Sequence, residues 1–291
     1  VMRMPQTREV LAMHERFQSV DKAQLARRFG AAARHYDAHA CFQQEVGLAL
    51  LKRMTNALPA SEPDHGGQGD TLADALPGSG LDLGCGTGFF LPQLARRCHR
   101  LHGLDLAPGM LQQAALRGSG AHLLCGDAEQ LPFADQSLDW VFSSLALQWC
   151  ERPAQAFAEL HRVLKPGGQL WFSTLLSDSL WQLREAWRTV DESAHVNRFL
   201  SLPQLHDAIA AGGFTAPRLE SLTWSLAYPE LTGLLRDLKG IGASQINDER
   251  QPGLSSRQRL QRLSLAYEAY RQPDGRLTAS YQVCLGQVGR R

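Results

Sequence analysis

Three features are scarce in this sequence, and each absence excludes a class of protein. The six cysteines are scattered without a C-x-x-C pair, which argues against a zinc site or a redox dithiol. No apolar run approaches the roughly 18 residues that a membrane span needs, and the first residues lack a signal-peptide pattern. The net charge of +1 is unlike that of a protein dominated by phosphate contacts. We therefore expect a cytoplasmic protein without a metal that binds neither membrane nor nucleic acid.

The distribution of charge is more informative than its total. Residues 1–54 carry 9 basic and 5 acidic side chains, residues 55–179 carry 7 and 13, and residues 180–291 carry 14 and 11. Basic flanks therefore surround an acidic middle. Hydrophobic residues make up 44% of the 291 residues, enough for a sizeable core.

The chain divides into three parts by composition. Apolar residues at helical spacing between 21 and 54 predict two helices in an N-terminal helical segment, 1–54. A stretch rich in Gly, Pro, Asp and Ser predicts a flexible insertion over 55–80. The main domain is expected over 81–291, with cap elements around 178–215 and 229–272.

From residue 81 onward, short apolar runs alternate with helical stretches. The pattern predicts strands at 81–83, 100–104, 122–125, 138–143 and 169–175, and helices at 89–97, 108–116 and 153–164. Helices are expected at 180–190 and 203–211, and late strands at 218–226 and 277–288, the second antiparallel at the sheet edge. This is a doubly wound α/β fold with a mostly parallel sheet.

The segment LDLGCGTG, residues 81–88, runs from a strand through glycines toward a helix. Glycines allow a tight turn and a close approach of the backbone to a ligand. A dinucleotide-binding loop has Gly or Ala at the next position for helix packing, but here Phe89 follows. Dehydrogenase chemistry is therefore disfavoured.

Two aspartates follow the next two strands. Asp105 can accept hydrogen bonds from ribose hydroxyls, and Asp127 can accept one from an adenine amino group. Each has an ordinary structural alternative, because Asp105 could cap the following helix and Asp127 could form a turn. Their placement after successive strands favours the ligand-binding hypothesis.

Together with GLDLAPGML (103–111), GDAEQLPFADQSLDWVFSSLALQW (126–149) and LHRVLKPGG (160–168), this segment resembles the class I S-adenosylmethionine-dependent methyltransferases. The resemblance implies a seven-stranded sheet with an antiparallel last hairpin and S-adenosylmethionine across the strand ends. It implies that Asp82 orients the loop and the methionine end. The cofactor-binding residues implied are Asp82, Gly84, Cys85, Gly86, Gly88, Asp105, Leu106, Asp127, Ala128 and Leu145.

Further stretches are similar to the malonyl-carrier-protein O-methyltransferase family of biotin synthesis. They are RFGAA (28–32) with Tyr36, SLALQW (144–149), HVNRF (195–199) and DLKGIGA (237–243). The resemblance implies esterification of the free carboxyl of a malonyl thioester on acyl carrier protein, which primes pimeloyl synthesis. A carboxylate is already ionised at neutral pH, so no side chain is needed as an obligatory base.

The candidates for binding the acceptor lie outside the cofactor motifs. They are Phe29, Tyr36, Gln148, Trp149, His195, Asn197, Arg198 and Lys239, of which Tyr36, Gln148 and His195 are positioning candidates. Structural alternatives stay open, because Trp149 could be a core residue, His195 a structural histidine and Lys239 a solvated cation. We expect Arg198 or Lys239 to pair with the acceptor carboxylate.

Two other functions remain open. A quinone or other small-molecule C- or O-methyltransferase would need a base, and His195 or Tyr36 could serve. A non-catalytic cofactor-binding module is the alternative from another class. The family resemblance implies docking of an acidic carrier protein on a basic rim, with these candidates: Arg27, Arg28, Arg34, Arg184, Arg188 and Arg198. We expect a monomer, and the sequence does not separate a carrier protein from coenzyme A.

Overall fold

A computed structural model describes residues 17–18, 20–57, 78–191, 195–243 and 256–291. Most of the predicted 55–80 insertion therefore lies outside the described residues. Seven strands form one sheet in the order β3-β2-β1-β4-β5-β7-β6. They are β1 (Ser79–Leu83), β2 (Arg100–Asp105), β3 (His122–Cys125), β4 (Leu138–Ser144), β5 (Leu164–Leu175), β6 (Arg218–Tyr228) and β7 (Leu277–Gly289). The predicted doubly wound, mostly parallel α/β sheet is confirmed.

The position of the last strand corrects one prediction. β7 is antiparallel to β5 and β6, as expected, but it lies between them, and β6 forms the edge. Arg218 and Glu220 expose their side chains on β6, whereas β7 is mostly buried. Charged side chains are tolerated at an edge and costly inside a sheet, which explains this order.

In the part of the chain that the structure describes, three helices precede the sheet, where two were predicted over 21–54. They are α2 (Lys22–Ala32), α3 (Tyr36–His39) and α4 (Cys41–Asn56). The side chain of Asp21 caps α2 by accepting a 2.8 Å hydrogen bond from the backbone N–H of Gln24. Three residues, 33–35, separate α2 from α3, so the short α3 turns the chain toward the sheet.

Helices cover both faces of the sheet. α4 and α5 (Leu91–Ala95) pack on one face, and α7 (Pro153–Val163) and α9 (Leu202–Ala211) on the other. The predicted helix 89–97 is thus shorter in the structure. On the first face, the ring of Phe42 from α4 stacks on Tyr281 of β7 with centroids 4.2 Å apart. The N-terminal helices therefore share a core with the last strand.

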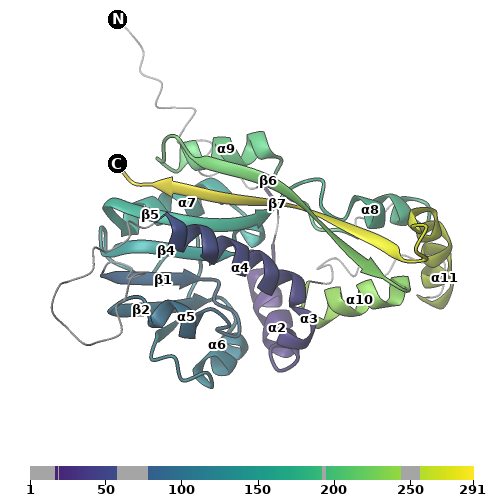
Figure 1. The fold of residues 1–291 in the computed structure, drawn as a ribbon, viewed down its shortest axis with the longest axis horizontal. Coiled ribbons are helices and arrows are strands. Elements are labelled where there is room, and N and C mark those ends of the chain that lie inside the picture. The colour runs from purple at the N-terminus through teal and green to yellow at the C-terminus, as the bar shows by residue number, and fades with distance from the viewer. Residues whose placement is uncertain (1–16, 19, 58–77, 192–194, 244–255) are drawn as a thin grey trace, which may run out of the picture.

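The remaining helices fall into two groups. α6 (Pro108–Ala115) follows β2, and a 3-10 turn, η1 (Leu147–Trp149), follows β4. Figure 1 shows α8 (Trp181–Arg188), α10 (Leu231–Gly240) and α11 (Ser256–Tyr267) beside the far end of β6 and β7, away from β1 and β2. We call α8, α10 and α11 the cap. A second 3-10 turn, η2 (Glu268–Tyr270), connects α11 toward β7.

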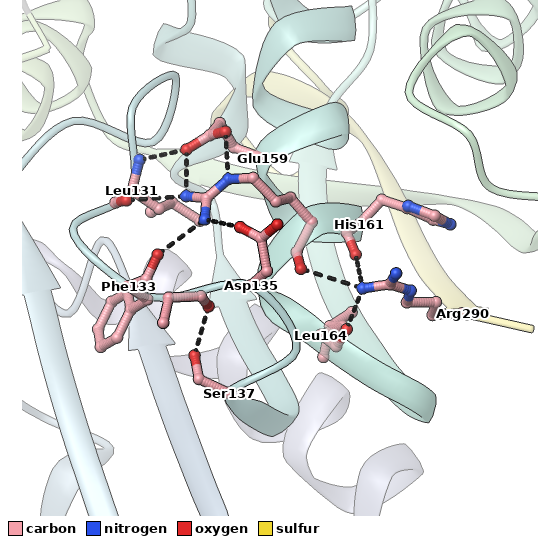
Figure 2. A network of polar contacts seen from close by, with 10 residues as sticks. Leu131, Phe133, Asp135, Ser137, Glu159, His161, Leu164 and Arg290 are labelled. Carbon is pink, nitrogen blue, oxygen red and sulfur yellow. Dashed lines mark hydrogen bonds and ion pairs between the residues drawn. The ribbon is translucent and has the colours of Figure 1, made fainter.

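A polar network fixes the connection between β3 and β4 on the side of α7 (Figure 2). Arg162 donates to the carbonyl oxygens of Phe133 and Leu131 at 2.8 and 3.0 Å and pairs with Glu159 at 2.8 Å. Arg290, near the end of the chain, donates to the carbonyl of His161 at 2.9 Å. The guanidinium of Arg162 lowers the pKa of Glu159, so this carboxylate stays ionised at neutral pH. The connection that follows Asp127 is therefore held rigidly.

Candidate functional site

The glycine loop after β1 has a backbone that only glycine adopts readily. Gly84, Gly86 and Gly88 have φ angles of 72°, 54° and 75°. No atom lies within 4 Å of the position that a Cβ on Gly86 would take, so this part of the loop faces open space. A Cβ on Gly88 would instead lie 2.9 Å from the Cβ of Ala114 in α6. Gly86 therefore lies on the open side of the loop, whereas Gly88 packs against α6, and its contact with a cofactor stays a prediction.

Asp105, the last residue of β2, holds the glycine loop by a hydrogen bond. Its Oδ2 accepts a 2.9 Å hydrogen bond from Gly86 N–H, and its Oδ1 accepts a 2.8 Å bond from Ala107 N–H. Burial raises the pKa of Asp105, and these backbone donors oppose that shift. Each carboxylate oxygen can accept a second hydrogen bond, so both remain available to a pair of hydroxyl groups.

Asp82 is the buried carboxyl before the glycines. Only 2% of the residue is exposed, and its Oδ2 has no hydrogen-bond partner. Burial, and then the negative charge of Asp105, raise the pKa of Asp82 to about 8. Asp82 and Cys85 line a small cavity of about 50 Å³ together with Gly84, Gly86 and Ser144. An unpaired buried carboxyl at this place is suited to a cationic group.

A larger cavity of about 570 Å³ opens at the carboxyl ends of β1, β2, β3 and β4. The lining combines acidic, glycine and aromatic residues from the sheet edge, the N-terminal helices and the cap. Most of the predicted site residues line it: Phe29, Tyr36, Gly84, Gly86, Asp105, Leu106, Asp127, Ala128, Leu145, Gln148, Trp149, His195 and Asn197. The predicted cofactor and acceptor candidates thus share one space.

Two residues in this wall hold a strained backbone. Leu145, directly after β4, has φ of 50°, and Leu180 has φ of 55°. The amide of Leu145 donates to the carbonyl and the hydroxyl oxygens of Ser173, both at 3.0 Å. Gln148 donates from its side-chain amide to the carbonyl of Leu145 at 2.6 Å. A left-handed conformation in a non-glycine residue is costly, so these contacts fix the wall against relaxation.

Lys22 of α2 reaches the third strand end, and the sequence prediction missed it. Its Nζ lies 2.5 Å from Asp127 Oδ2 and 3.0 Å from Glu129 Oε1. Burial lowers the pKa of Lys22, but its hydrogen bonds to the two carboxylates outweigh burial and hold the pKa above its ordinary value. Asp127 therefore offers a ligand only the acceptor positions that Lys22 leaves open.

The N-terminal helices are fastened over the glycine loop. Thr87 Oγ1 donates to Asp37 Oδ1 at 2.6 Å, and Arg117 donates to the carbonyl of Thr87 at 2.7 Å and pairs with Asp37. Phe29 meets Trp149 edge to face with ring centroids 5.3 Å apart. These contacts place α2 and α3 as a lid on the cofactor side of the cavity.

Tyr36 sits at the junction of the two cavities. Burial, and then the charges of Asp105 and Asp37, raise the pKa of Tyr36 well above its ordinary value. Its hydroxyl therefore stays protonated at neutral pH and can donate a hydrogen bond.

A cluster around Asp191, shortly after α8, includes Arg259 from helix α11 of the cap. His195 Nε2 lies 2.6 Å from Asp191 Oδ1, and Arg259 Nε donates to Asp191 Oδ2 at 3.2 Å. The ring of His195 stacks on Trp187 with centroids 3.7 Å apart. His195, Trp187 and Arg259 all line the large cavity. Arg259 was missed by the sequence prediction, because nothing in its spacing showed which face of α11 turns inward.

Two predicted acceptor contacts, Arg198 and Lys239, do not line either cavity. Arg198 is exposed and lies over the ring of Phe17 at 4.6 Å from the centroid. Lys239 is exposed on α10, where Leu235 and Leu238 supply the inward face. A helix turns by about 100° per residue, so a neighbour of Leu238 points elsewhere. The structure therefore places neither cation in a cavity wall, and their contact with the acceptor stays a prediction.

Within the described residues, no cluster of His, Cys, Asp and Glu side chains is arranged to hold a metal. All six cysteines are free thiols. In the same part of the chain no helix is both long and apolar enough to cross a membrane.

Glycines after β1, carboxyls at the end of β2 and just after β3, and a cavity across these strand ends are the features of a cofactor site in a doubly wound fold. Residues 81–172 match a family model described as a methyltransferase domain. A solved putative methyltransferase from Bacillus halodurans has a similar fold, with a TM-score of 0.57 and 19% identity over 84% of this chain and 98% of that chain.

Curated relatives define the family. Malonyl-[acyl-carrier protein] O-methyltransferase of Serratia marcescens is 42% identical over 94% of this chain and 97% of that protein. The protein of the same name from Erwinia pyrifoliae is 40% identical over 94% of this chain and 95% of that protein. The biotin biosynthesis bifunctional protein BioHC of Cellvibrio japonicus is 42% identical, but the chain spans only 49% of its length. The chain belongs to the malonyl-[acyl-carrier protein] O-methyltransferase family.

The residues fit S-adenosylmethionine, the methyl donor of this class. Gly86 leaves room for a ligand against the backbone, and Asp105 keeps acceptor positions for ribose hydroxyls. The unpaired Oδ2 of Asp82 suits a cationic amino group. Asp127 and Lys22 lie at the third strand end, where an adenine would extend.

Proposed function

We propose that this chain transfers a methyl group from S-adenosylmethionine to the free carboxylate of a malonyl thioester carried on acyl carrier protein. The observation that carries the proposal is the 42% identity to the Serratia marcescens enzyme over 94% of this chain and 97% of that protein. The product is a methyl ester, which would prime pimeloyl synthesis for biotin. Malonyl-coenzyme A carries the same carboxylate and is the second acceptor to test.

The cofactor, when bound, supplies an electrophilic methyl group on a sulfonium. A carboxylate oxygen forms the new bond to this carbon while the carbon–sulfur bond breaks and its electron pair stays on sulfur. No proton moves, so the chain needs to position and desolvate rather than to supply a base. Phe42, Leu175 and Tyr281 line the cavity with apolar surface that excludes water.

The chain's polar residues then have distinct proposed roles. Asp105 and the glycine loop hold the ribose side, and Asp127 with Lys22 holds the adenine side. Tyr36 donates a hydrogen bond from its protonated hydroxyl near the junction of the two cavities. Arg28 and Arg259 line the large cavity and take over the role first predicted for Arg198 and Lys239, pairing with the negative charge of the acceptor.

One observation favours a second candidate function. His195 pairs with Asp191 and faces the cavity, an arrangement that would also suit a general base for a phenol, quinone or carbon acceptor. Such an enzyme would belong to the same fold class but would leave a malonyl carboxylate unmodified.

The deciding experiment is mass spectrometry of malonyl-carrier protein after incubation with S-adenosylmethionine. We expect a gain of one methyl group on the malonyl form and none on acetyl-carrier protein, which lacks the carboxylate. Methylation of a quinone or phenol with no change in malonyl-carrier protein would support the second candidate. Binding of S-adenosylmethionine without transfer to any acceptor would indicate a non-catalytic module. The expected monomer can be checked by light scattering in the same preparation.

A further inference from the structure

Two residues that line the small cavity beside the glycine loop each have a buried side-chain oxygen without a hydrogen-bond partner. One is Oδ2 of Asp82, and the other is Oε1 of Gln43 in α4. Both residues line this space of about 50 Å³, and Gln43 also lines the large cavity. A buried acceptor without a hydrogen bond costs free energy, so two of them at one small site indicate a missing donor.

The chemistry of that donor follows from the two acceptors. A carboxyl and an amide side chain that line one space suit a primary ammonium group, which has three N–H donors and a positive charge. A carboxylate, a phosphate or an apolar group would leave both oxygens unsatisfied. We propose that Gln43 is a cofactor-binding residue that accepts a hydrogen bond from the α-ammonium of S-adenosylmethionine, beside Asp82.

This inference concerns a residue of the N-terminal helices that none of the glycine-loop motifs includes. The neighbouring Gln44 differs from it, because its side-chain amide donates to the carbonyl of Asp37 at 3.3 Å. Gln44 lines the same small cavity, so Gln44→Met is a matched control that disturbs this wall without removing an unpaired acceptor. The inference rests on the methyl donor only and is independent of the acceptor.

Calorimetry with two probes tests the proposal. S-adenosylhomocysteine has the ammonium group, whereas 5′-methylthioadenosine lacks the whole amino-acid end. Gln43→Met should weaken S-adenosylhomocysteine binding about tenfold and leave methylthioadenosine binding unchanged, since a charged hydrogen bond is lost. Gln44→Met should not alter the ratio of the two dissociation constants.

A conservative variant separates this role from packing. Gln43→Glu retains an oxygen acceptor at the same reach and should keep S-adenosylhomocysteine binding within about threefold of the wild type. An unchanged ratio in Gln43→Met, or an equal loss in Gln43→Met and Gln43→Glu, would overturn the proposal. If the wild type bound neither probe, the cofactor assignment itself would be wrong, which is a different result.

A second inference comes from the outward face of α11. Arg257 and Arg262 are exposed on this helix, and Leu265, about one turn beyond Arg262, is 76% exposed. Helix α11 contains no acidic residue, and in the part of the chain that the structure describes neither arginine makes an ion pair. The inward face packs through Leu263 and Tyr267, which are buried.

The same helix borders the large cavity. Leu260 is 39% exposed and lines the cavity beside Arg259, so α11 lies where the cavity meets the surface. The cap arginines first predicted to form the rim have other partners. Arg184 donates to the carbonyls of Ser177 and Ser179 at 2.9 and 3.0 Å, and Arg188 pairs with Glu185.

We infer that α11 is the docking face for an acidic helical carrier protein, an inference that rests on the proposed function. Carboxylates of the carrier would face Arg257 and Arg262, and an apolar residue would cover Leu265. Docking here would bring the carrier's thioester arm to Leu260 and Arg259 at the cavity mouth.

Charge reversal tests this surface. The double variant Arg257→Glu/Arg262→Glu should raise KM for malonyl-carrier protein at least fivefold and leave malonyl-coenzyme A methylation unchanged. Arg96→Glu/Arg100→Glu changes two exposed arginines near α5 and should affect neither acceptor. Equal effects of the two double variants, or no effect of the first, would overturn the docking face. If the wild type fails to methylate malonyl-carrier protein, the proposed function fails instead.

Discussion

Gly30 of α2 and Gly109 of α6 meet backbone to backbone, and the contact is asymmetric. A Cβ on Gly109 would lie 2.7 Å from the Cα of Gly30, whereas a Cβ on Gly30 would meet Gly109 at 3.7 Å. The first distance is a collision and the second is ordinary van der Waals contact. Helix α6 begins three residues after Asp105. The contact therefore packs α2 against the helix that follows this carboxylate.

The asymmetry gives a matched pair of variants. Gly109→Ala should lower the free energy of unfolding by about 1–3 kcal/mol and weaken cofactor binding, because α2 must move away. Gly30→Ala should be neutral or stabilising by up to about 1 kcal/mol, since alanine favours a helix. Chemical denaturation and calorimetry of both variants check this. Similar losses in the two variants would contradict the asymmetric contact.

Replacing Asp105 should separate binding from folding. Asp105→Ala removes the acceptor for Gly86 N–H and for the ribose hydroxyls, which should cost about 1.5–3 kcal/mol of cofactor binding. Calorimetry with S-adenosylhomocysteine measures the loss, and circular dichroism checks the fold. Normal affinity in a folded Asp105→Ala protein would show that the assignment is wrong.

Asp82 should make the stability of the cofactor-free protein depend on pH. Burial and the charge of Asp105 raise the pKa of Asp82 from 3.8 to about 8, so the folded chain keeps a proton that the unfolded chain loses. The free energy of unfolding should fall as pH rises from about 4 to about 8, by up to about 1.4 kcal/mol per unit. Asp82→Asn should flatten this slope in urea denaturation. Parallel pH profiles for the two proteins would speak against a raised pKa.

The pH dependence of catalysis should distinguish the two acceptor classes. A malonyl carboxylate is ionised throughout, and Tyr36 keeps its proton, so kcat should stay flat from about pH 6 to 8. A rise of kcat across this range that disappears in His195→Gln would instead indicate His195 as a base. Single-turnover rates of the wild type and His195→Gln measure this directly.

The acceptor cation should be Arg259 rather than Arg198 or Lys239. Arg259→Met should raise KM for the malonyl substrate about tenfold while cofactor affinity stays constant, because a charge-assisted pair is lost. Arg198→Met and Lys239→Met serve as controls and should leave KM unchanged, since neither side chain lines the cavity. A larger effect at either control position would restore the first prediction.

The sheet was largely predictable because each strand end carries a chemical signal. Glycines follow β1, and aspartates lie at the end of β2 and just after β3. The order of β6 and β7 was not predicted, because both strands alternate apolar and polar residues. Arg218 and Glu220 on β6 were the available signal for an edge.

The site was also predictable only in part. Motifs at strand ends identified Asp82, Asp105 and Asp127. Lys22 and Arg259 come from helices, and helical periodicity does not say which polar residue turns inward. Lys239 shows the same limit. It was predicted to contact the acceptor, but its side chain is exposed on α10 and lines neither cavity.

The stacking of Phe42 on Tyr281 has a consequence for engineering. These rings join a helix near the start of the chain to a strand near its end, and both also line the large cavity. The surface that excludes water from the reaction is therefore assembled from segments on both sides of the glycine loop. A chimaera that grafts the cap of one family member onto the sheet of another would also have to exchange α4 and the first half of β7. We therefore expect that acceptor specificity would not transfer with the cap alone.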